Sequence, residues 1–281
     1  MADDFDYIPE WGQLPVEKYI IRFWDPPSPQ TPKEQRSTLD TTLFTAEPWI
    51  KPSRIPTEDE VQILQPWRFD EIRRIAWQIW GCNNTQPLLL RTYYELEHHE
   101  SVNVDEWEEL SWNHEEIAWW SILNNKEVFD FGADWQRVFQ IFPEAPTQTR
   151  FRESLSKVKR QNKAGKLDLN TSLLRENPDA WDLLGSVSMG YILIVDKETL
   201  QTNQFLLVYF DWEQNVVAQG RISITEESLN QVLLDWFRSD PPRTIFEEGT
   251  IGEKYLVDGE IGRELYHFTK EELEDDPPME G

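Results

Sequence analysis

Tryptophan is the residue that most constrains this chain, because fourteen indole rings have to be accommodated in 281 residues. Each ring removes a large apolar area from water and still needs a hydrogen-bond partner for its N–H group. Such side chains can build a rigid core or line an aromatic cavity. Hydrophobic residues make up 39% of the sequence, which is enough for a folded chain with one large domain or two ordinary ones.

The charge of the chain limits the classes of molecule that it can bind. Fifty-two Asp and Glu residues against 27 Lys and Arg give a formal net charge of -25 at pH 7. This field repels phosphate backbones and anionic lipid headgroups, so we expect neither a nucleic acid nor a membrane surface as partner. A protein with a basic surface, or a small apolar molecule, is the expected partner.

The sequence predicts an intracellular protein, cytoplasmic with the nucleus as an alternative. No apolar run reaches the roughly 18 to 20 residues that a membrane-spanning helix needs, and the first residues lack the pattern of a signal peptide. Cys82 is the single cysteine, which excludes an internal disulfide and a multi-cysteine zinc site.

Residues 1–56 predict one strand followed by a segment that wraps the surface. The apolar run Tyr19–Trp24 is rich in β-branched and aromatic side chains, as strands are. Prolines 26, 27, 29 and 32 then end it, and the turn-forming residues that follow suggest a loop.

Residues 57–184 predict a mainly helical, tryptophan-rich region. Apolar residues recur at helical spacing from Ile72 to Trp80, where Gly81 would form the C-cap, and again from Trp135 to Phe142. Asn113 resembles an N-cap that opens a helix extending to Leu123. Residues 88–96 suit a strand or a helix equally well, and residues 150–166 predict a basic helix.

Residues 185–268 predict an antiparallel sheet with a helix on one face. Strands are expected at 191–195, 205–210 and 216–224, then a helix from 225 to 237. The segments 249–256 and 259–266 are alike and suggest paired turns or short strands, whereas 185–190 suggests a turn, and 269–281 is expected to be an acidic disordered tail. The predicted fold class is therefore α+β: a tryptophan-rich, mainly helical N-terminal part packed with a C-terminal β-meander plus helix.

The order of three strands and a helix from Gly190 to Phe237 resembles the closing part of Smi1/Knr4-type interaction domains. The resemblance covers less than a quarter of the chain and includes no diagnostic motif. It implies no site residue.

The motifs of common enzymes are missing from the sequence. No dinucleotide, P-loop or zincin motif occurs, so no cofactor is expected. Three histidines lie in an acidic stretch, but their spacing does not bring two imidazoles onto one ion, and we predict no metal site. His114, Glu115 and Glu116 are the candidates for proton transfer, because they lie among aromatic residues.

Two functions remain open. The first is a non-catalytic adaptor or regulatory protein that binds a partner through tryptophans surrounded by carboxylates, since tryptophan is enriched at interface hot spots. The second is a cofactor-independent enzyme or carrier for an apolar small molecule in a tryptophan-lined cavity, as an accessory protein of specialised metabolism. The residues expected to bind the partner or ligand are Trp112, Trp119, Trp120 and Trp135.

Overall fold

The computed structural model describes residues 7–43, 57–59, 68–81, 88–95, 121–145, 178–211, 213–238, 245 and 249–266. Helices and strands both occur, which confirms the predicted α+β class. The chain divides into two compact units. Unit 1 is Met1–Gln148 with Trp212–Gln214, and unit 2 is Thr149–Asp211 with Asn215–Gly281.

Three predicted features stay predictions. The expected domain boundaries at residues 56 and 184 are not tested by the division into units. The basic helix at 150–166 and the acidic tail at 269–281 lie outside the described residues.

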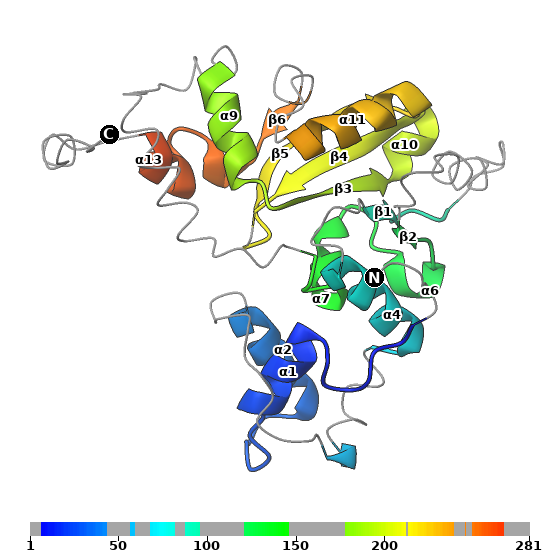
Figure 1. Cartoon of the computed structure of the whole chain (residues 1–281), viewed down its shortest axis with the longest axis vertical. Coiled ribbons are helices and arrows are strands. Elements are labelled where there is room, and N and C mark those ends of the chain that lie inside the picture. Colours follow the sequence, from blue (N-terminus) through cyan, green and yellow to red (C-terminus); the bar gives the residue numbers. More distant parts are fainter. Residues whose placement is uncertain are drawn as a thin grey trace, which may run out of the picture. The chain divides into compact units, whose positions relative to one another are not determined.

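Unit 1 begins with a helical hairpin, where the sequence predicts a strand and a loop. Helix α1 spans Pro15–Phe23 and helix α2 spans Pro32–Leu43, and they lie side by side (Figure 1). The predicted strand at 19–24 is wrong because Val16, Tyr19 and Ile20 share one face of a helix, where they form a buried cluster. The wrapping loop is likewise wrong over α2.

Helix α4 spans Asp70–Gly81 and confirms the helix predicted over 72–80. Ile72, Ala76 and Ile79 are buried along its inner face, at the spacing that the sequence displays. The sequence predicts Gly81 as the C-cap, but Gly81 is the last residue inside the helix, and the C-cap position comes one residue later.

A parallel pair of short strands follows in unit 1. Strand β1 spans Leu88–Arg91 and pairs with β2, Ser121–Leu123, so the ambiguous segment contains a strand. The helix predicted to extend to Leu123 is wrong over these last three residues, because backbone pairing with β1 overrides their helical spacing. Short helical turns complete the unit: α6 Lys126–Phe129, η1 Trp135–Arg137 and α7 Val138–Ile141.

Unit 2 contains the predicted antiparallel strands, at the predicted positions. They are β3 Gly190–Val195, β4 Gln204–Phe210 and β5 Val216–Ser223, joined in the order of the chain. A two-residue strand, β6 Thr250–Ile251, pairs with β5. Every residue of β3 is buried, so this strand belongs to the core of unit 2.

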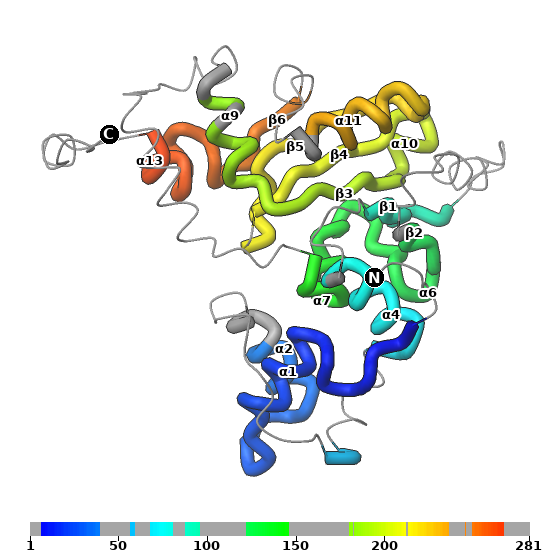
Figure 2. Tube along the Cα trace, in the orientation of Figure 1, coloured from blue at the N-terminus to red at the C-terminus, as the bar shows by residue number. Residues whose placement is uncertain are grey.

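Helices connect and cover these strands. Figure 2 shows the chain passing from β3 through α10, Lys197–Thr202, into β4 and from β5 into α11, Glu226–Arg238. Helix α11 confirms the predicted helix and runs along one face of the sheet (Figure 1). Thr225 is its N-cap, as predicted, with the Ser228 amide donating to its hydroxyl at 3.2 Å. Helix α9, Pro178–Val187, continues into the segment predicted as a turn.

The two similar glycine-containing segments adopt different structures. The first forms β6 and the turn η3, Glu253–Tyr255, whereas the second forms helix α13, Glu260–Tyr266, so the prediction of paired turns or strands is wrong for the second. What they share is a close backbone approach. A Cβ atom at Gly252 would meet the carbonyl oxygen of Val216, and one at Gly262 would meet that of Leu256.

Candidate functional site

Most of the predicted site residues lie outside the described residues. They are His114, Glu115, Glu116, Trp112, Trp119 and Trp120. Their roles stay predictions. The structure describes Trp135, which is the first residue of η1. Its side chain is 6% exposed and packs edge-on against Phe139, with ring centroids 5.9 Å apart. The Trp135 ring therefore packs in the core of unit 1, and its role in binding a partner or ligand stays a prediction.

The described structure instead presents aromatic and proline side chains where α1 ends. We call residues 23–27 the aromatic corner: Phe23, Trp24, Asp25, Pro26 and Pro27. Phe23 is 45% exposed, the two prolines are exposed and Trp24 is partly buried. A large apolar side chain in water next to two exposed prolines is a surface that another protein can cover.

A buried hydrophobic cluster packs against the aromatic corner. Val16, Tyr19 and Ile20 are its centre, and the partly buried Trp11, Trp24 and Leu39 pack against it. The Tyr19 ring lies beneath Phe23, with centroids 4.6 Å apart, and the Arg22 guanidinium lies 5.6 Å from the Phe23 centroid. These contacts hold the Phe23 ring in one place.

Gln35 fixes the aromatic corner to α2. Its side-chain amide donates to the Asp25 carbonyl at 2.9 Å, and its side-chain oxygen accepts from the Asp25 amide at 3.0 Å. Gln35 is 6% exposed, so these two bonds are partly shielded from water. A third bond, from the Ser28 amide to the Asp25 carbonyl at 2.9 Å, closes the turn through the two prolines.

The helix that carries Gln35 is itself capped. Thr31 precedes α2, its hydroxyl accepts from the Glu34 amide at 3.3 Å, and the Glu34 carboxylate accepts from the Thr31 amide at 2.9 Å. The Glu34 carboxylate accepts from the Thr31 backbone amide and from the Thr31 hydroxyl, and these two bonds lower the pKa of Glu34, the backbone bond most. Pro32 follows at the first helical position, where its missing N–H is harmless.

A buried ion pair joins this hairpin to α4. The Glu17 carboxylate is fully buried, accepts from Arg73 Nε at 2.6 Å and accepts from the Gly12 amide at 2.7 Å. Arg73 also donates to the Pro9 carbonyl at 2.7 Å. Since these groups satisfy one another away from water, they anchor the hairpin that carries the aromatic corner.

Unit 1 contains a second buried ion pair, between Arg68 and Glu144. Arg68 binds the Glu144 carboxylate through both terminal nitrogens, at 2.7 and 3.2 Å. Burial raises the pKa of Glu144, and the Arg68 guanidinium opposes that rise. Neither side chain exceeds 1% exposure, which leaves no room for a substrate, so the pair is structural.

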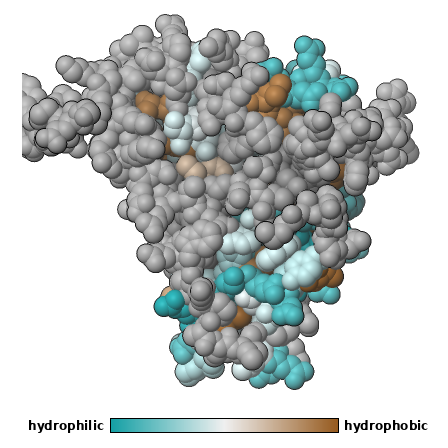
Figure 3. Space-filling view, in the orientation of Figure 1, coloured by the Kyte–Doolittle hydropathy of each residue, from teal (hydrophilic) through white to brown (hydrophobic). Residues whose placement is uncertain are grey.

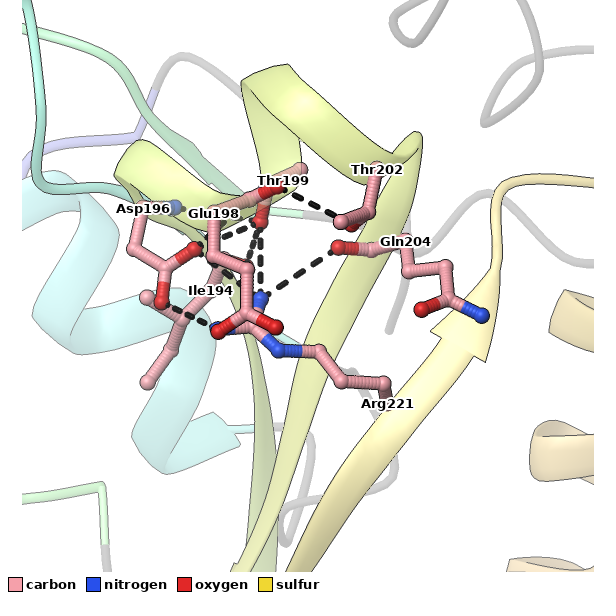
Figure 4. Close-up of polar contacts among 7 residues, drawn as sticks. All are labelled: Ile194, Asp196, Glu198, Thr199, Thr202, Gln204 and Arg221. Carbon is pink, nitrogen blue, oxygen red and sulfur yellow. Dashed lines mark hydrogen bonds and ion pairs between the residues drawn. The ribbon is translucent and has the colours of Figure 1, made fainter.

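Among the described residues of unit 2, the most extensive polar network surrounds Arg221 (Figure 4). The Arg221 guanidinium binds the Asp196 carboxylate with both terminal nitrogens, at 2.9 and 2.6 Å, and Glu198 at 2.8 Å. Thr199 and the Gln204 carbonyl accept further bonds from it. These donors are directed to acceptors of the protein, so the network joins β5 to the start of α10.

A buried carboxylate closes the other end of the β4–β5 hairpin. Asp211 has no exposed surface and accepts from the Tyr255 hydroxyl at 2.6 Å. The Asn215 amide and side chain donate to it at 2.8 and 2.9 Å. Asp211 therefore ties the hairpin turn to η3.

Sequence reasoning missed the aromatic corner, although two signals for it were present. Val16, Tyr19, Ile20 and Phe23 recur at helical spacing after Pro15, and Thr31 and Glu34 have the spacing of a capping box. Nothing in the sequence pairs Gln35 with Asp25 or Glu17 with Arg73, because these contacts depend on the tertiary fold.

Metal and membrane features can be checked over the same residues. The described ranges contain no group of three His, Cys, Asp or Glu side chains that could hold a metal ion. Of the helices that the structure describes, none is long and apolar enough to cross a membrane.

Comparison with known proteins adds no relative. No family model, no curated protein and no solved structure matches the chain. The likeness of segment 190–237 to Smi1/Knr4-type domains therefore stays a resemblance.

Proposed function

We propose that the chain is a non-catalytic adaptor or regulatory protein that binds a protein partner through the aromatic corner of unit 1. The observation that carries this proposal is the exposure of Phe23 at the end of α1, next to a turn held by Gln35. The Phe23 side chain is 45% exposed, and two residues further along the chain the backbone of Asp25 makes three hydrogen bonds.

Rigidity supports a binding role. A partner that covers Phe23, Pro26 and Pro27 would bury apolar area, which drives association. Ordering a flexible segment on binding would consume much of that gain. The two Gln35 bonds and the Tyr19 contact place the corner in its binding conformation before the partner arrives.

Charge favours a basic partner. The net charge of -25 attracts a cationic protein over distances of about 10 Å at moderate salt and accelerates its approach. The short-range contacts at the corner are mainly apolar, so the field sets the rate of encounter and the corner sets the lifetime of the complex.

We place this role inside the cell, in the cytoplasm or the nucleus. The single cysteine of the sequence fits a reducing compartment, where a binding protein does not rely on disulfides.

The test is affinity capture from native extract with matched surface variants. Wild-type protein and Phe23→Ser are compared by quantitative mass spectrometry, and we expect the partner recovered with wild type to fall at least about tenfold with the variant, because an aromatic anchor contributes more than 1.4 kcal/mol. The captured partner should be basic, and its recovery should decrease as salt rises.

Leu234→Ser is the matched control, since Leu234 is also 45% exposed but belongs to α11 in unit 2. It should retain the partner. Equal loss with both variants, or full retention with Phe23→Ser, would contradict the proposal.

A further inference from the structure

Arg91 has no acidic partner among the described residues, although the chain is strongly acidic. It is the last residue of β1 and is partly buried. Its Nε donates to the Tyr93 carbonyl at 3.1 Å, and its guanidinium carbon lies 4.6 Å from the Tyr94 ring centroid. Within the described part of the chain, its two terminal nitrogens make neither a hydrogen bond nor an ion pair.

Two hydroxyl groups next to Arg91 are also unpaired. Thr92 is fully buried, and neither its Oγ1 nor the Tyr94 hydroxyl, itself shielded from solvent, has a hydrogen-bond partner among the described residues. An unpaired buried hydroxyl destabilises a fold, and native proteins contain few of them. Three donors in four consecutive residues are therefore without an acceptor among the described residues and are available to a ligand.

The Tyr94 hydroxyl remains a donor at neutral pH. Burial raises its pKa to about 12, with the Arg91 charge lowering it and the Asp130 charge adding to the rise. The Tyr94 ring also keeps the guanidinium in place from one side, while the Tyr93 carbonyl holds its Nε. The two free nitrogens form a planar fork suited to two oxygens of one anion.

We propose that Arg91, Thr92 and Tyr94 form a binding site for the oxyanion group of a small molecule, a carboxylate or a phosphate. The three residues lie at and just after the carboxyl end of β1, which pairs in parallel with β2. In open α/β sheets, ligands bind beyond the carboxyl ends of strands at a switch point of the topology, and the three residues occupy the corresponding end of β1. This site is independent of the aromatic corner and of its protein partner.

The rest of the molecule makes binding at this site selective. The net charge of -25, to which the exposed Asp130 belongs, repels anions from most of the surface. A small anion that binds saturably must therefore gain specific short-range hydrogen bonds. Non-specific binding, which obscures such measurements on basic proteins, is suppressed here.

The test titrates the full chain with inorganic phosphate in one arm and acetate in the other, at constant ionic strength set with KCl. Isothermal calorimetry measures the affinity, and the thermal midpoint checks it independently, because a bound ligand stabilises the folded state. We expect saturable binding in at least one arm, and the tighter arm identifies the oxyanion.

Variants then assign the binding to the three residues. Arg91→Gln should abolish it, whereas Tyr94→Phe and Thr92→Val, which each remove only a hydroxyl, should weaken it about tenfold. Arg263→Gln is the matched control, because Arg263 Nε also donates to a backbone carbonyl, that of Asp258, at 2.9 Å. It should bind as wild type does, and thermal unfolding in KCl shows that each variant is folded.

The assignment is overturned if neither anion binds saturably, or if Arg91→Gln binds as tightly as wild type. Equal losses in Arg263→Gln and Arg91→Gln would also overturn it, since they would show general charge effects.

Discussion

At the scale of single residues, two buried tyrosines of unit 2 differ in one respect. Tyr255 and Tyr266 both have 0% exposure. The Tyr255 hydroxyl donates to the Asp211 carboxylate at 2.6 Å, whereas the Tyr266 hydroxyl has no hydrogen-bond partner among the described residues. A hydrogen bond to a charged group stabilises a fold more than a neutral one does, and an unpaired buried hydroxyl destabilises it.

We therefore expect Tyr255→Phe to lower the free energy of unfolding by about 1.5–3 kcal/mol, because Asp211 loses a donor in a buried place. Tyr266→Phe should leave it unchanged or raise it slightly, because the ring stays and only an unpaired hydroxyl is removed. Urea unfolding of both variants measures the difference. Similar losses in the two variants would show that ring packing, and not the bond to Asp211, governs stability at Tyr255.

At the scale of elements, α10 shows how a six-residue helix is stabilised. Asp196 and Thr199 form a reciprocal capping box at its start, and Asn203 ends it in the left-handed conformation with φ of 55°. Arg221 of β5 adds bonds to Asp196 and Glu198 (Figure 4). Since helices this short are not stable alone, the caps and β5 together determine this one.

The Asp196 pair makes this stabilisation depend on pH. Partial burial raises the pKa of Asp196, but the bonds from Arg221 and Thr199 outweigh it and hold the pKa below the usual 3.8. A lowered folded-state pKa contributes stability that is fully present above the unfolded pKa and is lost as pH falls through the folded value.

Asp196→Asn keeps a good N-cap residue and removes the charge. We expect it to be less stable than wild type at pH 7, and the difference to shrink as pH falls below about 4. Urea unfolding between pH 7 and pH 3 measures this. Asp258→Asn, at an exposed position of unit 2, should stay within about 0.5 kcal/mol of wild type at pH 7. A difference that grows on acidification would contradict the role given to Asp196.

The helices and strands also show where sequence patterns are enough to predict secondary structure. Helix α4, helix α11 and the strands β3 to β5 follow their predicted periods because each buries the face that its apolar residues mark. Helix α1 was mistaken for a strand because β-branched and aromatic content outweighed the spacing of Val16, Tyr19 and Ile20. The candidate site was missed for the same reason, since the aromatic corner depends on α1 and α2 being helices.

At the scale of the whole molecule, repulsion among like charges opposes folding. The net charge of -25 is spread over 281 residues, and the described surface in Figure 3 shows both small hydrophobic areas and hydrophilic ones. Salt acts in two directions, because it screens this long-range repulsion and also weakens exposed ion pairs such as Lys254–Glu260. The repulsion is the larger effect when one sign of charge dominates.

We therefore expect the thermal midpoint to rise by several degrees between about 0.01 and 0.15 M salt, as the screening length falls from about 30 to 8 Å. Scanning calorimetry in NaCl and in KCl measures the rise, which should be the same in both salts. A midpoint that falls with salt would show that attractive ion pairs dominate instead.

The sequence by itself determined the α+β class, the meander of unit 2 and the helices whose apolar residues repeat along one face. These are local properties, because a period of two or of 3.6 residues marks the buried side wherever the element packs. Tertiary structure alone decided the pairing of β1 with β2 and of Glu17 with Arg73, 56 residues apart. A buried charge needs an opposite charge, and the backbone groups of a strand need the groups of a neighbouring strand. The fold brings these partners together, because they lie far apart in the sequence.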